Sequence, residues 1–329
     1  MNAPLLSAHD LTKHFPMRSG VFRRAAGQIK AVDGIDLEVR AGETLGLVGE
    51  SGCGKSTTAR LLLRLMRPTR GEVRFQGEDL LAMSGSRLRQ TRRQMQIVFQ
   101  DPQASLNPRM SAGSIVAEPL RTHGYDGTLR DRVRELLELV GLRPEHADRY
   151  PHEFSGGQRQ RVGIARAIAL NPKLIICDEA VSALDVSVQA QIVNLLQDLQ
   201  ERLGLTYIFI AHDLAVVENM CDRVSVMHLG KIVESGARAQ IFGAARHPYT
   251  ASLLSAVPAP DPMRERQRQR VVLAGEPPSP ARPPSGCSFH PRCPQAQDDC
   301  VVNTPTLEPD AEGRLTACWH PHEAGLPAG

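Results

Sequence analysis

Short apolar runs alternate with longer amphipathic segments along most of the chain. Four runs, at 45–48, 95–99, 174–177 and 206–211, have the length and the apolar or β-branched composition of buried strands, and residues 73–75 are also typical of a strand. Longer helical segments separate many of these runs. The pattern therefore predicts an α/β fold in which helical crossovers join parallel strands.

Helical spacing is clearest at 129–140. The apolar residues of this segment are mostly three or four positions apart, and Gly141 follows as a stop signal. The same criteria predict three more helices, at 56–66, 163–170 and 186–203.

The composition is that of an ordinary globular protein. The chain has 329 residues, of which 41% are hydrophobic, enough for one large domain with a smaller appendage. Its 39 Lys and Arg residues against 36 Asp and Glu residues give a formal net charge of +3, too small a field to indicate nucleic acid as a partner. The amino terminus lacks the features of a secretory signal, and no stretch approaches the roughly 18 apolar residues of a membrane span. We therefore expect a cytoplasmic protein.

The amino-acid composition changes near residue 258. Three prolines at alternate positions lead into an Arg- and Gln-rich run at 264–270 and then into a proline-rich segment at 277–284. This composition is typical of a linker. We therefore predict a large domain at 1–262, followed at 263–329 by a linker and a small carboxyl-terminal domain.

A glycine-rich octet follows the first predicted strand and opens the first predicted helix. Residues 49–56 read GESGCGKS, which satisfies the pattern G-x-x-x-x-G-K-[ST] of a phosphate-binding loop, or P-loop. Glycines let backbone N–H groups approach phosphates closely, and the following helix adds the positive end of its dipole. In such a loop Lys55 contacts the β- and γ-phosphates, and Ser56 is a ligand of Mg²⁺. The predicted ATP-binding residues are Gly49, Glu50, Ser51, Gly52, Cys53, Gly54, Lys55, Ser56 and Thr57.

Two adjacent acids, Asp178 and Glu179, follow the apolar run at 174–177. The carboxyl ends of strands are where α/β sheets place their ligands. Asp178 suits coordination of Mg²⁺, directly or through water, and Glu179 suits orienting or deprotonating the attacking water. The alternative is that the two acids only cap the next helix, and the P-loop favours the catalytic interpretation.

The segment FSGGQ at 154–158 is a second candidate for binding phosphate. Ser155, Gly156 and Gly157 open a helix and offer a hydroxyl and unhindered backbone N–H groups, without a lysine. Two such helix starts in one chain suggest a nucleotide site assembled from two chains. With these motifs the sequence resembles the ATPases of the ABC family, whose signature is LSGGQ. The resemblance implies that ATP and Mg²⁺ are bound, and that Ser155, Gly156, Gly157 and Gln158 of this chain close over the γ-phosphate held by the P-loop of the partner subunit.

The resemblance assigns roles to four more positions. Gln100 matches the glutamine that senses Mg²⁺ and water, and Asp185 matches the D-loop aspartate that reaches across the dimer. His212 resembles the switch histidine that contacts the γ-phosphate, and Phe15 resembles the aromatic residue that stacks on adenine. Without the resemblance, His212 would be a histidine at a strand end and Phe15 a core residue. The implied catalytic residues are Glu179, His212 and Gln100, and the implied Mg²⁺ residues are Ser56, Gln100 and Asp178.

Two positions depart from the family pattern. Phe154 replaces the leucine of the signature, and Ala180 replaces the proline that usually follows the catalytic glutamate. Because proline mainly stiffens a turn, we expect Ala180 to loosen the positioning of Glu179 without abolishing hydrolysis.

The resemblance also implies a fold. It consists of a RecA-like P-loop NTPase core, an antiparallel β subdomain, an inserted α-helical subdomain at roughly 101–168, and a small cysteine-containing carboxyl-terminal domain.

Three further segments narrow the resemblance to the ATP-binding subunits of oligopeptide, dipeptide and nickel importers. They are VFQDPQASLNPR at 98–109, HPYT at 247–250 and the cysteine-bearing tail, and the likeness runs from Leu5 to Trp319. The extra residues at 18–28 resemble the second of two paralogous ATPase subunits. This implies a peripheral subunit on the cytoplasmic side of the membrane, in a heterodimer with its paralogue beneath two permeases, with an extracytoplasmic solute-binding protein that selects the solute. Peptides are the expected cargo, and nickel or another solute is the alternative.

Two other functions fit the sequence less well. Soluble ABC proteins that act on nucleic acid or the ribosome usually fuse two cassettes or insert a long coiled coil, whereas this chain has one cassette and no sustained heptads. A regulatory ATP binder without turnover predicts damage at Glu179 or His212, and both positions are intact.

Four of the seven cysteines lie in the tail, at Cys287, Cys293, Cys300 and Cys318. In a reducing compartment we expect thiols or metal ligands instead of disulfides. Tetrahedral zinc and a [4Fe–4S] cluster both accept four thiolates, but familiar zinc sites have shorter gaps between paired cysteines. Some members of the importer family carry an iron–sulfur cluster in the matching tail, so the resemblance favours the cluster over zinc. Unligated thiols are the remaining alternative.

Overall fold

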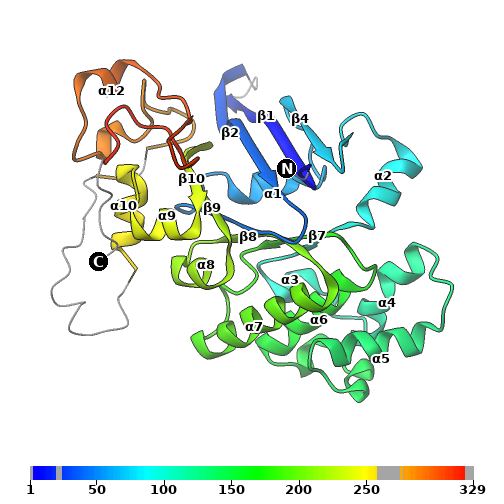
Figure 1. Cartoon of the computed structure of the whole chain (residues 1–329). Coiled ribbons are helices and arrows are strands. Elements are labelled where there is room, and N and C mark those ends of the chain that lie inside the picture. Colours follow the sequence, from blue (N-terminus) through cyan, green and yellow to red (C-terminus); the bar gives the residue numbers. More distant parts are fainter. Residues whose placement is uncertain (1–2, 20–23, 258–274, 277, 323–329) are drawn as a thin grey trace, which may run out of the picture. The chain divides into compact units, whose positions relative to one another are not determined.

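The structure is a computed structural model that describes residues 3–19, 24–257, 275–276 and 278–322 (Figure 1). The chain divides into two compact units. Unit 1 comprises Met1–Leu5, Val39–Thr44 and Ala82–Ala211, and unit 2 comprises Leu6–Glu38, Leu45–Leu81 and His212–Gly329. The Arg- and Gln-rich run at 264–270 lies outside the described residues, as does the central part, 20–23, of the expected extra segment.

Unit 1 contains three parallel strands in the order β8-β7-β6. β7 (Leu174–Asp178) pairs in parallel with β6 (Met95–Val98) on one side and with β8 (Thr206–Ala211) on the other. Every residue of β7 and β8 is buried. Burial on both faces explains why these strands are apolar runs without polar alternation, and it confirms the predicted parallel sheet.

Helices make up most of the rest of unit 1. α4 (Ala112–Thr122), α5 (Leu129–Leu139) and α6 (Gly156–Ile168) pack on one another (Figure 1), and each buries apolar side chains. These helices lie where the helical subdomain was expected, and its limits, 101–168, stay a prediction. The other helices of unit 1 are α2 (Gly85–Arg92), α3 (Pro102–Ser105), η1 (Pro144–Asp148), η2 (Pro151–Glu153) and α7 (Val186–Leu203).

Unit 2 contains two sets of strands. The first has the order β2-β1-β4-β5, and β4 is antiparallel to both β1 and β5. Its members are β1 (Leu6–Ser19), β2 (Arg24–Val39), β4 (Arg70–Phe75) and β5 (Glu78–Asp79). An antiparallel sheet of this kind is what the resemblance implied.

The second set has the order β11-β12-β10-β9-β3. β3 and β9 are parallel, and the remaining pairs are antiparallel. The set consists of β3 (Thr44–Val48), β9 (Arg223–His228), β10 (Lys231–Ala237), β11 (Glu308–Pro309) and β12 (Leu315–Thr316). Because β12 pairs with β10, the tail is joined to the strands of unit 2 by backbone hydrogen bonds.

The helices of unit 2 are short. They are α1 (Lys55–Leu62), α8 (Leu214–Met220), α9 (Arg238–Gly243), α10 (Pro248–Ser255), η3 (His290–Arg292) and α12 (Asp298–Val302). The last two belong to the tail, and the boundaries expected for the two domains, 1–262 and 263–329, stay predictions. In the described part of the chain, no helix has both the length and the apolar character needed to cross a membrane.

Several predicted elements differ from the observed ones in their limits. The helix predicted at 56–66 ends at Leu62, because Arg64 has a positive φ of 49° that cannot continue a helix. The segment predicted as helical at 163–170 belongs to α6, which begins at Gly156 after the predicted cap Ser155 and ends at Ile168, two residues before the predicted limit. The strand predicted at 206–211 and the helix predicted at 186–203 have the predicted limits.

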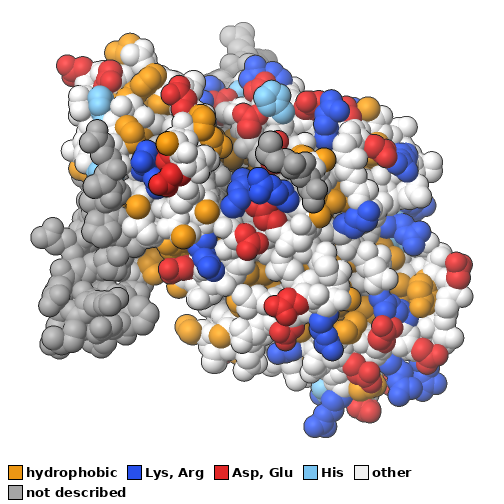
Figure 2. Space-filling model, viewed as in Figure 1, with side chains coloured by type: hydrophobic (Ala, Val, Ile, Leu, Met, Phe, Trp, Pro, Cys, Tyr) orange, Lys and Arg blue, Asp and Glu red, His pale blue; other side chains and the backbone are white. Residues whose placement is uncertain are grey.

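The surface carries both signs of charge. Among the described residues on the face shown in Figure 2, Lys and Arg side chains are interspersed with Asp and Glu side chains. This distribution agrees with the near balance of charges in the sequence.

Candidate functional site

The P-loop connects β3 to α1 in unit 2, and its path leaves no space for side chains at two glycines. Gly49 and Gly54 have φ values of 149° and 114°, in the region that favours glycine. A Cβ atom at Gly49 would lie 2.1 Å from the carbonyl oxygen of Met227, and one at Gly54 would lie 2.1 Å from the carbonyl oxygen of Ala31. The loop therefore follows the backbones of β9 and β2 closely.

Lys55 lies at the first position of α1 and is only 4% exposed. Its Nζ donates hydrogen bonds to the carbonyl oxygens of Gly49 (2.7 Å) and Glu50 (3.1 Å). Ser56 follows in the first turn of the helix, where backbone N–H groups have no intrahelical acceptor. The loop thus presents a cation and a helix amino terminus, the two features that bind polyphosphate.

Unit 2 also contains Phe15 and His212, the residues that the resemblance assigns to adenine and to the γ-phosphate. Phe15 is half-buried in β1, and the Nζ of Lys13 lies 5.3 Å from the centroid of its ring. His212 is exposed and follows the last residue of β8 in the chain. The structure describes both residues, and their roles stay predictions.

Unit 1 brings two of the predicted catalytic residues together. Asp178 is the last residue of β7 and is 6% exposed, and Glu179 follows it with a positive φ of 51°. Nε2 of Gln100 donates a hydrogen bond of 2.7 Å to Oε2 of Glu179. A positive φ at a residue other than glycine costs free energy and is concentrated at functional sites. Ala180, which replaces the usual proline, is 2% exposed.

The signature segment forms the amino terminus of α6. The hydroxyl of Ser155 accepts a hydrogen bond from the N–H of Gln158 (3.3 Å), and the side chain of Gln158 accepts one from the N–H of Ser155 (3.1 Å). This reciprocal capping box satisfies two backbone donors of the helix start. A Cβ atom at Gly157 would lie 2.5 Å from Cγ1 of Val188, which explains the need for glycine there.

Two neighbours of the signature complete this region of unit 1. Phe154 is 4% exposed, so its apolar side chain is buried next to the start of the signature segment. Asp185, the expected D-loop residue, is exposed at the amino terminus of α7.

The four cysteines of the tail line one small cavity together with His290 and His320. Cys300 is buried, and the other three are partly exposed. Burial, together with the neighbouring thiols of Cys287, Cys293 and Cys300, raises the pKa of Cys318 to about 12. The fold of the tail therefore brings the four cysteines to one cavity, as the prediction of a shared metal site requires.

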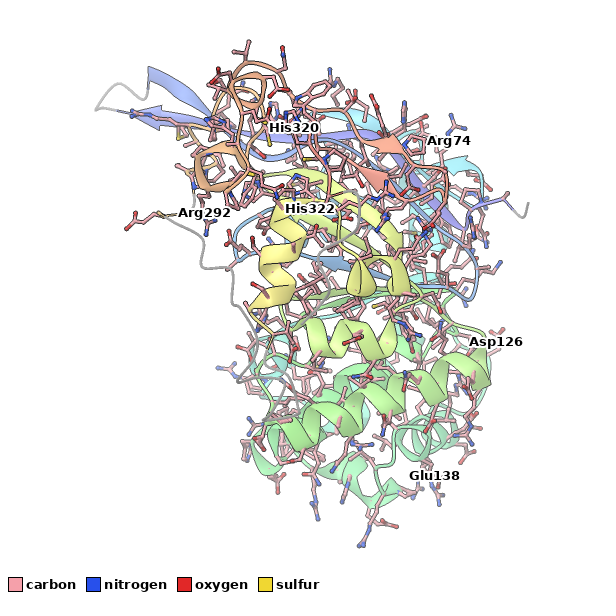
Figure 3. All side chains as sticks on the ribbon, turned by 60° about the vertical axis from the view of Figure 1, so that its left-hand side comes forward. Arg74, Asp126, Glu138, Arg292, His320 and His322 are labelled. Carbon is pink, nitrogen blue, oxygen red and sulfur yellow. The ribbon has the colours of Figure 1, made fainter. Side chains whose placement is uncertain are left out.

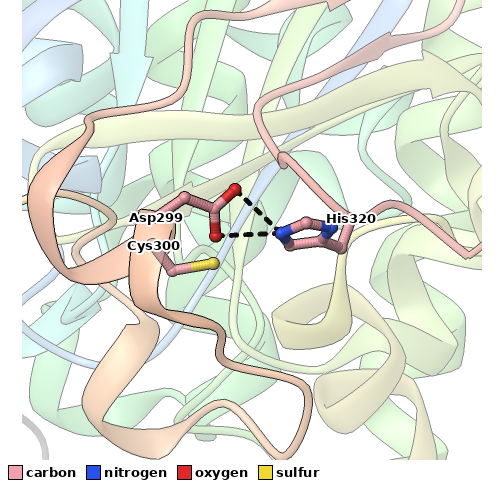
Figure 4. Close-up of side chains that lie close together, drawn as sticks. All are labelled: Asp299, Cys300 and His320. Carbon is pink, nitrogen blue, oxygen red and sulfur yellow. Dashed lines mark hydrogen bonds and ion pairs between the residues drawn. The ribbon is translucent and has the colours of Figure 1, made fainter.

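The spacing of the thiols bears on which metal would suit them. Zinc with Zn–S bonds of about 2.3 Å holds its four sulfur atoms about 3.8 Å apart. Metal ligands in proteins include histidine nitrogens, cysteine sulfurs and carboxylate oxygens. Among the described residues, Asp299, Cys300 and His320 are the one group of three whose ligand atoms all lie within 4.8 Å of one another (Figure 4). Cys300 is the one tail cysteine in this group, so the geometry of the described residues does not by itself assign the four thiols to zinc.

His320 contacts the carboxylate of Asp299 in this group. Its Nε2 lies 3.0 Å from both carboxylate oxygens. The hydrogen bond to His320 holds the pKa of Asp299 below its usual range.

Two further residues contact the P-loop, Tyr249 and Arg292, and neither belongs to a motif that predicted this. Both contact Glu50, from 199 and 242 positions away in the chain. Tyr249 lies in the segment HPYT at 247–250, which predicted membership of the importer family but no contact with the P-loop.

Two features define a P-loop ATPase. A glycine-rich loop opens α1, and a buried strand ends in Asp178, followed by Glu179, which accepts a hydrogen bond from Gln100. A family model described as "ABC transporter" matches residues 32–182, and one described as "Oligopeptide/dipeptide transporter, C-terminal region" matches residues 233–300. The chain belongs to the ABC transporter family, as an ATP-hydrolysing subunit with the carboxyl-terminal region of its oligopeptide/dipeptide branch.

Curated relatives cover nearly the full length of the chain. It is 53% identical to the oligopeptide transport ATP-binding protein AppF of Bacillus subtilis over 95% of this chain and 96% of that protein. It is 55% identical to OppF of Salmonella typhimurium, with 92% of each chain covered, and 50% identical to the dipeptide transport protein DppF of Haemophilus influenzae, with 97% of each covered.

Solved structures agree on the fold. The ATP-binding cassette MJ0796, in a dimeric post-hydrolysis state with ADP and Pi, is 30% identical with a TM-score of 0.61, over 71% of this chain and 98% of that one. The cassette fold with a P-loop NTPase core is therefore confirmed. That the tail is a separate domain stays a prediction.

Proposed function

We propose that this chain is an ATP-hydrolysing subunit that powers the import of dipeptides or oligopeptides. The observation that carries the proposal is its similarity, over almost its whole length, to proteins named for oligopeptide and dipeptide transport. Its partners in this proposal are a paralogous ATPase subunit, two membrane-spanning permeases and, through the permeases, an extracytoplasmic solute-binding protein. The subunit then lies at the cytoplasmic side of the membrane.

The proposed chemistry assigns roles to residues of both units. In unit 2, the P-loop binds the phosphates of ATP with Lys55 and the N–H groups of α1, Ser56 binds Mg²⁺, and Phe15 stacks on adenine. His212 contacts the γ-phosphate. The buried position of Lys55 at a helix amino terminus supports the role of the P-loop in binding phosphate, and the roles of Phe15 and His212 rest on the resemblance.

In unit 1, Asp178 binds Mg²⁺ and Glu179 orients or deprotonates the attacking water. Gln100 contributes to the Mg²⁺ site and holds Glu179 through its 2.7 Å hydrogen bond. Ser155, Gly156, Gly157 and Gln158 bind the γ-phosphate of ATP held by the partner subunit, and Asp185 reaches toward that subunit. ATP then clamps two subunits together, and its hydrolysis separates them and moves the permeases through the helical subdomain.

The proposal is tested by purifying the full chain with the permeases and ATPase encoded beside it and reconstituting them in vesicles. We expect the permeases to co-purify, and peptide delivered by the solute-binding protein to stimulate ATP hydrolysis. Stimulation by nickel and not by peptide would show that the cargo is nickel, and the chain would still be a transporter subunit. Stable association with DNA or ribosomes, without permeases, would overturn the proposal.

We further propose that the tail holds a [4Fe–4S] cluster through Cys287, Cys293, Cys300 and Cys318. The support is that these four thiols line one cavity, and that the resemblance to the importer subunits favours a cluster over zinc. When bound, such a cluster supplies four covalent links between segments of the tail and a one-electron redox centre. Its thiolates would be stabilised by the metal, which reverses the effect of burial on their pKa values.

Metal analysis of the protein purified without oxygen tests this assignment. We expect iron and acid-labile sulfide, with a broad absorbance near about 400 nm. Cys318→Ser removes one ligand and lowers the iron content. Cys221→Ser removes a buried thiol from the body of unit 2, outside the tail, and leaves the iron content unchanged. Zinc in stoichiometric amount, with no iron, would exclude the cluster.

A further inference from the structure

The second residue of the P-loop, Glu50, is held by two residues from the carboxyl-terminal part of unit 2. Its backbone N–H donates to the hydroxyl of Tyr249 at 2.9 Å. Its carboxylate accepts hydrogen bonds from Nη1 of Arg292 at 3.0 and 3.1 Å. The side chains of Arg292 and Glu50 are 8% and 29% exposed, so the ion pair is partly withdrawn from water. Charge-assisted bonds of this kind are stronger than neutral ones.

Tyr249 has little freedom to move. It is fully buried, and its ring centroid lies 4.5 Å from that of His228 and 5.3 Å from that of Phe289, which is 1% exposed. Nδ1 of His228 lies 3.0 Å from the hydroxyl of Ser288. An aromatic cluster made from β9, α10 and the tail therefore supports the hydroxyl that receives the N–H of Glu50.

The position of Arg292 is set by the fold of the tail. Arg292 ends the 3₁₀ helix η3, and its N–H donates to the carbonyl oxygen of Phe289 at 3.0 Å. Cys287, three residues before η3, is bonded through its N–H to the carbonyl oxygen of Cys300 at 2.8 Å. Figure 3 shows Arg292 in the same tail as His320 and His322. The residue that contacts the P-loop is thus adjacent to the cysteine-lined cavity, next to Cys293.

The P-loop needs such support because its backbone is intrinsically free. Gly49, Gly52 and Gly54 all have positive φ values, and glycine loses more conformational entropy on ordering than other residues. A loop already fixed in its binding conformation has less entropy to lose when phosphate binds, and its affinity is correspondingly higher.

We propose that Arg292 and Tyr249 are positioning residues for ATP. They hold Glu50, and through it the N–H groups that follow in the loop, in the conformation that binds phosphate. The tail thereby supports the nucleotide site of its own subunit. This inference rests on the proposed function only in assuming that the P-loop binds ATP.

A double-mutant cycle in the full chain tests the proposal. Arg292→Gln, Glu50→Gln and the double variant are compared by the Kd for a fluorescent ATP analogue and by KM and kcat for ATP hydrolysis. We expect Kd and KM to rise about fivefold in each single variant, with kcat little changed, and the double variant to be no weaker than either single one. Additive losses in the double variant would overturn the proposal, because Arg292 would then act independently of Glu50.

Three variants separate positioning from folding. Arg292→Lys keeps the charge and should recover part of the affinity, and Tyr249→Phe, which lacks the acceptor, should raise Kd. Arg246→Gln is the matched control, because its ion pair with Asp310 (3.3 Å) also anchors the tail without contacting the P-loop. It should leave Kd unchanged.

Thermal unfolding of every variant identifies loss of folding. An unchanged Kd in folded Arg292→Gln would overturn the inference while leaving the proposed function intact. Absence of ATP binding by the unsubstituted protein would instead remove the proposed function, and the inference with it.

Discussion

Nε2 of Gln100 lies 2.7 Å from Oε2 of Glu179, although the two residues are 79 positions apart in the chain. Gln100 closely follows β6 and Glu179 directly follows β7, and these strands are parallel neighbours in unit 1. Carboxyl ends of adjacent parallel strands meet at one edge of the sheet. Strand pairing therefore places an amide donor on the carboxylate that we propose as the base.

Glu179→Gln should lower kcat for ATP hydrolysis by about 10²- to 10⁴-fold, because an amide cannot accept the proton of the attacking water. ATP binding should be retained, so the variant should accumulate as an ATP-bound dimer in size-exclusion chromatography with ATP and Mg²⁺. Glu135→Gln, on the exposed side of α5, is the control and should turn over normally. Unchanged turnover in Glu179→Gln would show that another group is the base.

Ser155→Ala and Ser111→Ala separate a capping role from a role in hydrolysis. Each serine caps a helix by accepting a backbone N–H at 3.3 Å, so each substitution should lower the free energy of unfolding by about 1 kcal/mol. Only Ser155→Ala should also lose ATP hydrolysis, since only Ser155 lies in the signature. Equal activity in the two variants at equal stability would contradict our assignment of Ser155 to the γ-phosphate.

Gly54→Ala should destabilise the protein by about 2 kcal/mol or more and abolish ATP binding. The new Cβ atom would meet the carbonyl oxygen of Ala31 at 2.1 Å, at a φ that alanine rarely adopts. Gly163→Ala is the matched control in the interior of α6, where a Cβ atom meets nothing within 4 Å. It should stabilise the helix by about 0.5–1 kcal/mol. Thermal unfolding with and without ATP measures both effects, and a neutral Gly54→Ala would contradict the tight path described for the loop.

The stability of the protein should fall as pH decreases from about 6.5 to about 4, in part because of His228. Burial, together with the charge of Arg292, lowers the pKa of this histidine to about 4, whereas histidine in an unfolded chain titrates near about 6.5. In this window the unfolded state binds a proton that the folded state does not, so acid favours unfolding. The full contribution near pH 4 is about 2–3 kcal/mol.

Unfolding by denaturant at several pH values measures the slope. His228→Gln should flatten it between pH 6.5 and 4, whereas His152→Gln, at an exposed position, should leave it unchanged. An identical slope in His228→Gln and the unsubstituted protein would show that His228 is not responsible.

The parallel strands and the longest helix could be predicted from the sequence because each has a strong local signal. β7 and β8 are buried throughout, and apart from Asp178 at the end of β7 and Thr206 at the start of β8 they consist of apolar or aromatic residues. α7 ends where Gly204 takes a left-handed conformation, with φ of 64°, which is the stop that glycine indicates in a sequence. The P-loop and the paired acids were predictable for the same reason, since their motifs are contiguous.

Contacts between distant segments could not be predicted in this way. The positive φ of Glu179 and its bond to Gln100 depend on strand pairing, and no residue type at these positions indicates either. The contacts of Tyr249 and Arg292 with Glu50 join segments about 200 residues apart or more. Such contacts are specified by the packing of unit 2 as a whole, and local propensity carries no information about them.

Lys55 is almost entirely shielded from water, and the two oxygens that its ammonium group contacts are neutral carbonyls. Removing a cation from water without an anion beside it is unfavourable. Folding of the chain therefore withdraws the ammonium group from water before any phosphate contacts it. A phosphate oxygen that binds Lys55 displaces little water, and it forms a charge-assisted hydrogen bond stronger than those to the two carbonyls.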